Sequence, residues 1–132
     1  MIHIFLVDDS AMMRALLRAS LERREGWVVV GEACNGRHAL ETFQNHMPHV
    51  TVMDYLMPEM DGLEASRHLT RRHPDVLILM VTTDPSRQLQ EEARKLGIKG
   101  LCPKSQMHCL LQAVEAVVKG GTYFRHEGAA AG

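Results

Sequence analysis

Polar side chains that could do chemistry follow the apolar segments of this sequence, at the points where β-strands are expected to end. Carboxylates follow the first and third segments, hydroxyl groups follow the fourth, and an ammonium group follows the fifth. In a parallel sheet these strand ends open on one edge, where ligands of open α/β folds bind. We therefore expect one crevice to collect all of them. In chain order they are Asp8 and Asp9, Asp54, Thr82 and Thr83, and Lys104.

These residue types suit the transfer of a phosphoryl group. Three carboxylates in one crevice repel one another, and at least one pKa rises unless a cation compensates. Lys104 can supply one compact positive charge. Mg²⁺ can supply more, because it binds carboxylates, water and phosphate oxygens, and it suits this donor set better than Zn²⁺. A carboxylate nucleophile, a Mg²⁺ site, a lysine and a hydroxyl are the parts that phosphoryl transfer uses.

Each residue also has a purely structural interpretation. Asp8 and Asp9 can cap a helix, and Asp54 can stand in a turn. Thr82 can begin a capping turn, and a lone lysine such as Lys104 is commonly solvated. Taken singly, about two in three such residues would be structural. Their conjunction at four strand ends favours a functional site.

The segments that must position these residues alternate between strand and helix patterns. Five short apolar runs predict strands, and helix-length stretches separate them, as parallel pairing requires. Right-handed crossovers then place helices on both faces of one sheet. We therefore predict an α/β fold with a doubly wound, five-stranded parallel sheet. The predicted strands are 2–7, 27–34, 50–53, 76–81 and 98–102.

The predicted helices differ in the width of their apolar faces. The fifth, from Met107 to Val118, has the clearest amphipathic pattern. The fourth has a narrow apolar stripe, which lowers the cost of local rearrangement. That stripe consists of Leu89, Ala93 and Leu96. The first helix is expected to turn one apolar side to the core, formed by Met12, Ala15, Leu16 and Ala19.

Composition narrows the class of protein. A chain of 132 residues, 45% of them apolar, is about one domain. A net charge of −1 gives no attraction to nucleic acid or anionic membranes. A helix that crosses a membrane needs about 20 apolar residues, and no apolar run in the sequence approaches that length. Three scattered cysteines suggest reduced thiols in a cytoplasmic protein, and the eight histidines lack the spacing of a zinc site.

From residue 2 to residue 121 the sequence resembles the receiver domain of bacterial two-component response regulators. The resemblance rests on the strand-end residues above together with the run Met57-Pro58-Glu59-Met60-Asp61-Gly62. It implies a flavodoxin-like (βα)5 fold with strand order 2-1-3-4-5. It also implies a receiver domain at 1–121, followed at 122–132 by the start of a linker or an appended tail.

The resemblance implies roles for the acidic residues. Asp54 would accept a phosphoryl group from a sensor histidine kinase. Asp9 would bind Mg²⁺ directly and Asp8 mostly through water. Asp54 would also be a metal ligand, and the third protein ligand would be the backbone carbonyl of Leu56, whose side chain is therefore free to vary.

The resemblance also implies a switch. Lys104 would contact the phosphoryl group, and the hydroxyl of Thr82 would move toward the phosphorylated aspartate. Phosphorylation adds negative charge and acceptor oxygens, which can bias a two-state element. We expect the face formed by the fourth helix, fifth strand and fifth helix to change, and to be a possible homodimer surface.

Three positions depart from the commonest receiver pattern. Thr83 stands where a small alanine or glycine is usual, and Leu101 stands where a switch aromatic is usual. Ser105 follows the lysine where many receivers have a proline. These departures leave the catalytic set intact, but they put the aromatic part of the switch in question.

Residues 117–124 resemble receivers of the NarL/FixJ branch just before a linker to a LuxR-type helix-turn-helix. This predicts a phosphorylation-activated switch for a DNA-binding domain, in a chain that itself binds neither nucleic acid nor membrane. The alternative is a stand-alone receiver that acts by protein binding. An enzyme acting on other molecules is disfavoured, because Leu56 stands where an aspartyl phosphotransferase needs a second acid. The chain would catalyse only its own phosphorylation and dephosphorylation.

Overall fold

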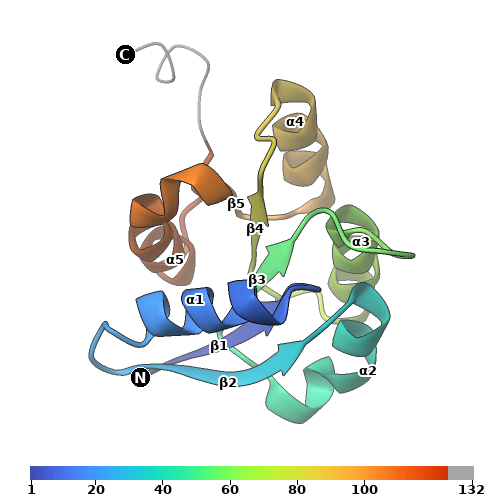
Figure 1. The fold of residues 1–132 in the computed structure, drawn as a ribbon. Coiled ribbons are helices and arrows are strands. Elements are labelled where there is room, and N and C mark those ends of the chain that lie inside the picture. The colour runs from blue at the N-terminus through green and yellow to red at the C-terminus, as the bar shows by residue number, and fades with distance from the viewer. Residues whose placement is uncertain (125–132) are drawn as a thin grey trace.

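Five parallel strands form one sheet in the order β2-β1-β3-β4-β5 (Figure 1). The structure is a computed structural model, and it describes residues 1–124. The strand order and the parallel pairing confirm the predicted doubly wound fold. The strands are β1 (Ile2–Val7), β2 (Trp27–Ala33), β3 (Val50–Asp54), β4 (Ile78–Thr82) and β5 (Gly100–Pro103).

Helices cover both faces of the sheet. Each helix connects one strand to the next parallel strand, and the right-handed crossovers place it on one face or the other. In Figure 1, α1 and α5 lie on one face, and α2, α3 and α4 lie on the other. A short 3₁₀ helix, η1 (Lys104–Cys109), joins β5 to α5. The α-helices are α1 (Ala11–Leu21), α2 (Gly36–His46), α3 (Gly62–Arg72), α4 (Arg87–Leu96) and α5 (Leu110–Val118).

The sheet separates two apolar cores. Every residue of β3 and of β4 is buried, as expected for central strands covered on both faces. Phe5 and Met53 belong to the core beneath α2, α3 and α4. Leu6 and Val52 belong to the core beneath α1 and α5. Alternate side chains of each strand therefore pack against the helices on opposite faces of the sheet.

Four helices begin at side-chain caps close to the carboxyl edge of the sheet. Ser10 and Asn35 accept hydrogen bonds from the backbone amides three residues ahead, and so do Asp61 and Ser86. Each such cap contributes about 1 kcal/mol and fixes where the helix starts. These caps define the loops in which the polar strand-end residues lie.

The predicted inward face of α1 was wrong. The helix buries Leu17 and Leu21, whereas Met12 and Leu16 are 75% and 56% exposed. Both sets of residues have helical spacing, so periodicity alone does not decide which one faces inward. The rotation of α1 is set by long-range contacts, in which the arginines of the helix reach a glutamate on β2.

The start of the last helix also differs from the prediction. The regular helix α5 begins at Leu110 rather than Met107, and the segment before it is kinked at Gln106, whose backbone is non-helical at φ −124° and ψ 55°. Residues 104–109 instead form η1. The narrow stripe of α4 is confirmed, since this helix buries only Leu89 and Ala93.

Candidate functional site

The pairing register brings the predicted acidic residues together. Val7 lies opposite Met53 across β1 and β3, so Asp8 follows at the level of Asp54. Carboxylate oxygens of Asp8, Asp9 and Asp54 all lie within 4.8 Å of one another. Asp8 and Asp54 are only 1% and 4% exposed, whereas Asp9 is exposed to solvent. One half-open acidic crevice therefore forms at the carboxyl edge.

Lys104 lies in the same crevice. Thr82 pairs with Pro103 at the end of β4 and β5, which places Lys104 one residue beyond the sheet. Its Nζ lies 3.0 Å from Oδ1 of Asp54 and 3.3 Å from Oδ2 of Asp8. Burial by itself lowers the pKa of Lys104, but the two carboxylates hold it above its ordinary value. The ammonium therefore stays charged between two acids.

Asp54 is held in an environment that favours its protonated form. Burial raises its pKa from 3.8 to about 6, and the charges of Asp8 and Asp9 act in the same direction. The hydrogen bond and positive charge of Lys104 oppose this increase without cancelling it. A second cation in the crevice would complete the compensation, since opposite charges favour the carboxylate.

The turn that carries Asp8 is held from two sides. Oδ1 of Asp8 accepts a hydrogen bond from the backbone amide of Ser10 at 2.9 Å. On the other side, Nη1 of Arg14 donates to the backbone carbonyl of Asp8 at 2.7 Å. The backbone of the acidic turn is thus tied to the first turns of α1.

A glutamate on β2 fixes the arginine that holds this turn. Glu32 accepts from Nε of Arg14 at 2.8 Å and from Nη2 of Arg18 at 2.6 Å. The hydrogen bond from Arg18 lowers the pKa of Glu32, against an opposing effect of burial, and Arg14 adds to the decrease. Sequence reasoning missed this cluster. Two features of the sequence could have indicated it: a single acid inside the otherwise apolar β2, and arginines four positions apart on α1.

Gly62 lies directly against the functional strand end. Its amide donates to the carbonyl of Tyr55 at 2.6 Å. A Cβ at this position would collide with the backbone carbonyl of Asp54. The glycine therefore lets the start of α3 pack onto the end of β3, and this close approach explains why the loop after Asp54 ends with Asp61-Gly62.

The remaining predicted site residues occupy different environments. Thr82 is buried at the end of β4, and its Oγ1 accepts a hydrogen bond from the amide of Asp84 at 3.1 Å. Thr83 is exposed. The side chain of Leu56 is 58% exposed, and Leu101 is buried in the core beneath α4. The carbonyl of Leu56 as a metal ligand stays a prediction.

The crevice fits a divalent metal ion with oxygen ligands. Three carboxylates converge on one point, and Oδ2 of the buried Asp8 faces the Lys104 ammonium at 3.3 Å. Histidine and cysteine take no part in this group. An oxygen-only set with solvent access at Asp9 matches the preference of Mg²⁺ for few carboxylates and several waters.

A comparison with family models decides the class of protein. The model of the response regulator receiver domain matches residues 4–115, which is most of the chain. The chain belongs to this family. Its receiver fold carries the acidic crevice and the lysine at the strand ends described above. Within residues 1–124, none of the helices has the length and apolar character needed to cross a bilayer.

Curated relatives include response regulators and a chemotaxis protein. The chain is 35% identical over 124 residues to the response regulator UvrY of Escherichia coli, covering 93% of the chain and 57% of UvrY. It is 31% identical over 123 residues to the transcriptional regulatory protein DegU of Brevibacillus brevis, covering 92% of the chain and 52% of DegU. It is 32% identical to the chemotaxis protein CheY of Thermotoga maritima, covering 88% of the chain and 97% of CheY.

Solved structures agree with the receiver fold. A two-component response regulator of the LuxR family from Aurantimonas sp. SI85-9A1 has a TM-score of 0.92 at 31% identity, covering 98% of the chain and 93% of that structure. The isolated receiver domain of RcsB from Salmonella enterica has a TM-score of 0.87 at 24% identity, which shows the fold alone. The chain spans about half the length of relatives such as DegU and UvrY.

Proposed function

We propose that this receiver accepts a phosphoryl group on Asp54 from a phosphohistidine of a sensor histidine kinase. The observation that carries the proposal is the position of Lys104, whose Nζ lies 3.0 Å from Oδ1 of a nearly fully buried Asp54. If Asp54 were only a solvated turn residue, it would need no cation beside it. An aspartate that receives a phosphoryl group needs one to neutralise the charge on the transferred oxygens.

The transfer makes one bond and breaks one. A carboxylate oxygen of Asp54 attacks the phosphorus, the P–N bond to the histidine breaks, and the histidine nitrogen keeps the electron pair. Lys104 balances the charge of the phosphoryl oxygens. The residues that would hold Mg²⁺ are Asp8, Asp9, Asp54 and Leu56, the last through its carbonyl; the ion neutralises charge on phosphoryl oxygens when bound. Because Asp54 attacks as the carboxylate, its raised pKa favours transfer at neutral or higher pH.

Thr82 connects the modified aspartate to α4. Its Oγ1 accepts from the amide of Asp84, two residues before the N-cap Ser86. Movement of this hydroxyl toward a phosphoryl group on Asp54 would break that hydrogen bond and release the loop before α4. Because α4 buries only Leu89 and Ala93, few apolar contacts oppose its displacement.

Exposed apolar side chains on α1 and in the loop after Asp54 offer a candidate surface for a protein partner. Met12 and Leu16 are exposed on α1, and Leu56 is exposed in the loop after Asp54. Exposed apolar groups that gather near a functional site mark protein contacts. We assign this surface, the α1 surface, to docking of the phosphohistidine domain of the kinase. We also propose a cytoplasmic location, which follows from the proposed kinase partner.

The output is proposed from the relatives. UvrY and DegU are regulators about twice the length of this chain, so we propose that phosphorylation controls a DNA-binding domain outside it. The second candidate is a stand-alone receiver, favoured by the nearly complete coverage of the Thermotoga CheY. Some relatives are protein-glutamate methylesterases, of which the chain covers about a quarter. We propose no activity on other molecules for this chain.

Incubation with Mg²⁺ and acetyl phosphate, followed by intact mass measurement, tests the proposal. One phosphoryl adduct is expected in the parent, and none in Asp54→Asn or after chelation of the metal. Asp75→Asn, which changes an exposed aspartate, is the matched control and should keep the adduct. A folded parent that gains no adduct, or an adduct that persists in Asp54→Asn, would refute the assignment.

A further inference from the structure

The chain returns to the sheet after α5 and pairs with its edge. A turn at Gly120 and Gly121 follows α5, with the amide of Gly121 bonded to the carbonyl of Ala116 at 2.9 Å. Tyr123 then forms a parallel bridge with Gly100 of β5. We call residues Thr122–Phe124 the strap. In the sheet, β5 is an edge strand, so the strap occupies backbone groups that would otherwise face outward.

Two hydrogen bonds hold the strap to β5. The amide of Tyr123 donates to the carbonyl of Lys99 at 2.8 Å, and the amide of Leu101 donates to the carbonyl of Tyr123 at 2.8 Å. Gly100 lies between these two bonds. A Cβ on Gly100 would lie 2.9 Å from the carbonyl oxygen of Tyr123 and 2.9 Å from Cδ1 of Leu79, so the glycine provides room for the strap.

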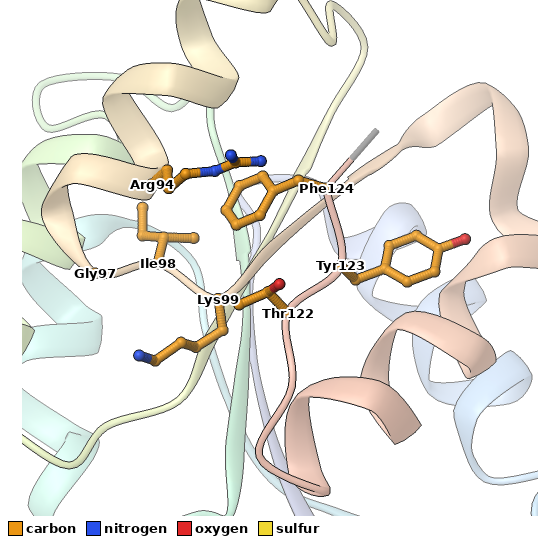
Figure 2. A pocket seen from close by; sticks show the side chains of 7 residues that line it. All are labelled: Arg94, Gly97, Ile98, Lys99, Thr122, Tyr123 and Phe124. Carbon is orange, nitrogen blue, oxygen red and sulfur yellow. The ribbon is translucent and has the colours of Figure 1, made fainter. Parts of the chain in front are cut away.

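The side chains of the strap alternate between the two faces of the sheet, as in a strand. Tyr123 packs against the core beneath α1 and α5, and Phe124 packs against the core beneath α4. Figure 2 shows the Phe124 ring beneath the Arg94 side chain of α4 and the Tyr123 ring pointing the other way. The guanidinium carbon of Arg94 lies 4.6 Å from the ring centroid of Phe124.

The contact between the strap and α4 is incomplete. A hollow of about 420 Å³ remains between them, lined on one side by Arg94, Ile98 and Lys99 and on the other by the strap (Figure 2). Two backbone bonds, the contact with Arg94 and the packing of Tyr123 and Phe124 against the two cores hold the strap beside this hollow.

We infer that the strap is the occupant of the β5 edge and that it keeps a second copy of the chain from pairing there. An unpaired edge strand is a template for association with another chain. Here the edge runs through the uncharged β5, and α4 beside it carries both signs of charge, with Glu91, Glu92, Arg94 and Lys95. Such a surface can be self-complementary across a two-fold axis. This inference does not depend on phosphorylation of Asp54.

Two variants of Tyr123 test the inference in the full chain without phosphoryl donor. Tyr123→Pro removes the amide that bonds to Lys99, whereas the matched control Tyr123→Ala removes the ring and keeps the amide. Amide exchange at Leu101 reports whether the strap is bound, and sedimentation reports self-association. For Tyr123→Pro we expect at least tenfold faster exchange at Leu101 in dilute protein and at least tenfold tighter self-association. Protection of Leu101 should return as the protein concentration rises.

Each other result overturns the inference. Unchanged protection of Leu101 in Tyr123→Pro would mean that the strap does not hold the edge. Fast exchange without increased self-association would mean that the strap does not keep copies apart. Equal self-association of Tyr123→Ala and Tyr123→Pro would assign the effect to the ring. Should Tyr123→Pro fail to fold, Gly100→Ala provides the same two measurements, because its Cβ would lie 2.9 Å from the carbonyl oxygen of Tyr123 and would displace the strap.

Discussion

The ammonium of Lys104 lies 3.0 Å from Oδ1 of Asp54, although the two residues are 50 positions apart in the chain. The contact joins the end of β3 to the residue that follows β5. The contact therefore contributes to the electrostatics of the crevice. It also connects the acidic site to the end of β5, the edge strand with which the strap pairs.

Replacement of Lys104 tests the electrostatic part of this link. Lys104→Met leaves Asp54 and Asp8 buried without their shared cation, which costs stability because an unpaired buried charge is expensive. We expect a loss of about 2 kcal/mol at pH 7 and an about 100-fold slower phosphorylation by acetyl phosphate. Denaturant unfolding and time-resolved mass measurement check both values. Lys119→Met, at an exposed lysine, should behave as the parent.

The pKa of Asp54 predicts how stability depends on pH in metal-free buffer. The folded chain holds this proton up to about pH 6, whereas the unfolded chain releases it near 3.8. The folded state therefore binds more protons between these values, and the free energy of unfolding should fall as the pH rises from about 4 to above 6.

Asp54→Asn removes this dependence. The difference between 3.8 and about 6 corresponds to up to about 3 kcal/mol, so the variant should exceed the parent by up to that amount at pH 7.5. Near pH 4 the two should be equally stable. Unfolding in urea with EDTA at both pH values measures the difference. A variant as stable as the parent at pH 7.5 would contradict the raised pKa, and Asp75→Asn controls for loss of charge.

The cluster of Arg14, Glu32 and Arg18 predicts an indirect effect on metal binding. Arg14→Lys keeps the charge but removes the forked geometry that joins Glu32 to the carbonyl of Asp8. The turn that carries Asp8 and Asp9 is then less well held, and we expect about three- to tenfold weaker Mg²⁺ binding by calorimetry. Arg23→Lys, at an exposed arginine, is the control. Equal affinities in all three proteins would leave Arg14 with a purely structural role.

The α1 surface separates kinase docking from the chemistry of transfer. Leu16→Asp places a charge on this surface, at a side chain that is 56% exposed. We expect at least tenfold slower phosphorylation by a sensor kinase that acts on the parent, because a charge in the core of an interface is costly. Phosphorylation by acetyl phosphate should stay within about twofold of the parent, since Asp54 and Lys104 are unchanged.

Met47→Asp is the matched control for that variant. Met47 is 61% exposed and ends α2 in a left-handed conformation, at φ 41°, that aspartate tolerates. It should retain the parent rate with both donors. Equal losses with kinase and with acetyl phosphate in Leu16→Asp would show that the substitution disturbs the crevice and not the docking.

The amino-acid sequence by itself determined the strands, their order through the family resemblance, and the convergence of the acids with Lys104. These follow from local patterns, because short apolar runs followed by polar residues mark strand ends, and parallel strands share one edge. Such features depend on neighbours in the chain, so the sequence reports them directly.

The tertiary structure alone decided which side of α1 faces the core and what covers the β5 edge. Both sides of α1 have helical spacing, and the bonds from Arg14 and Arg18 to Glu32 go with the orientation that buries Leu17. The strap, expected from residue 122 onward as the start of a linker, is paired with Lys99 and Leu101, while residues 125–132 lie outside the described structure. The orientation of α1 and the pairing of the strap depend on contacts between segments that are distant in the chain. Local sequence patterns do not report the free energies of such contacts.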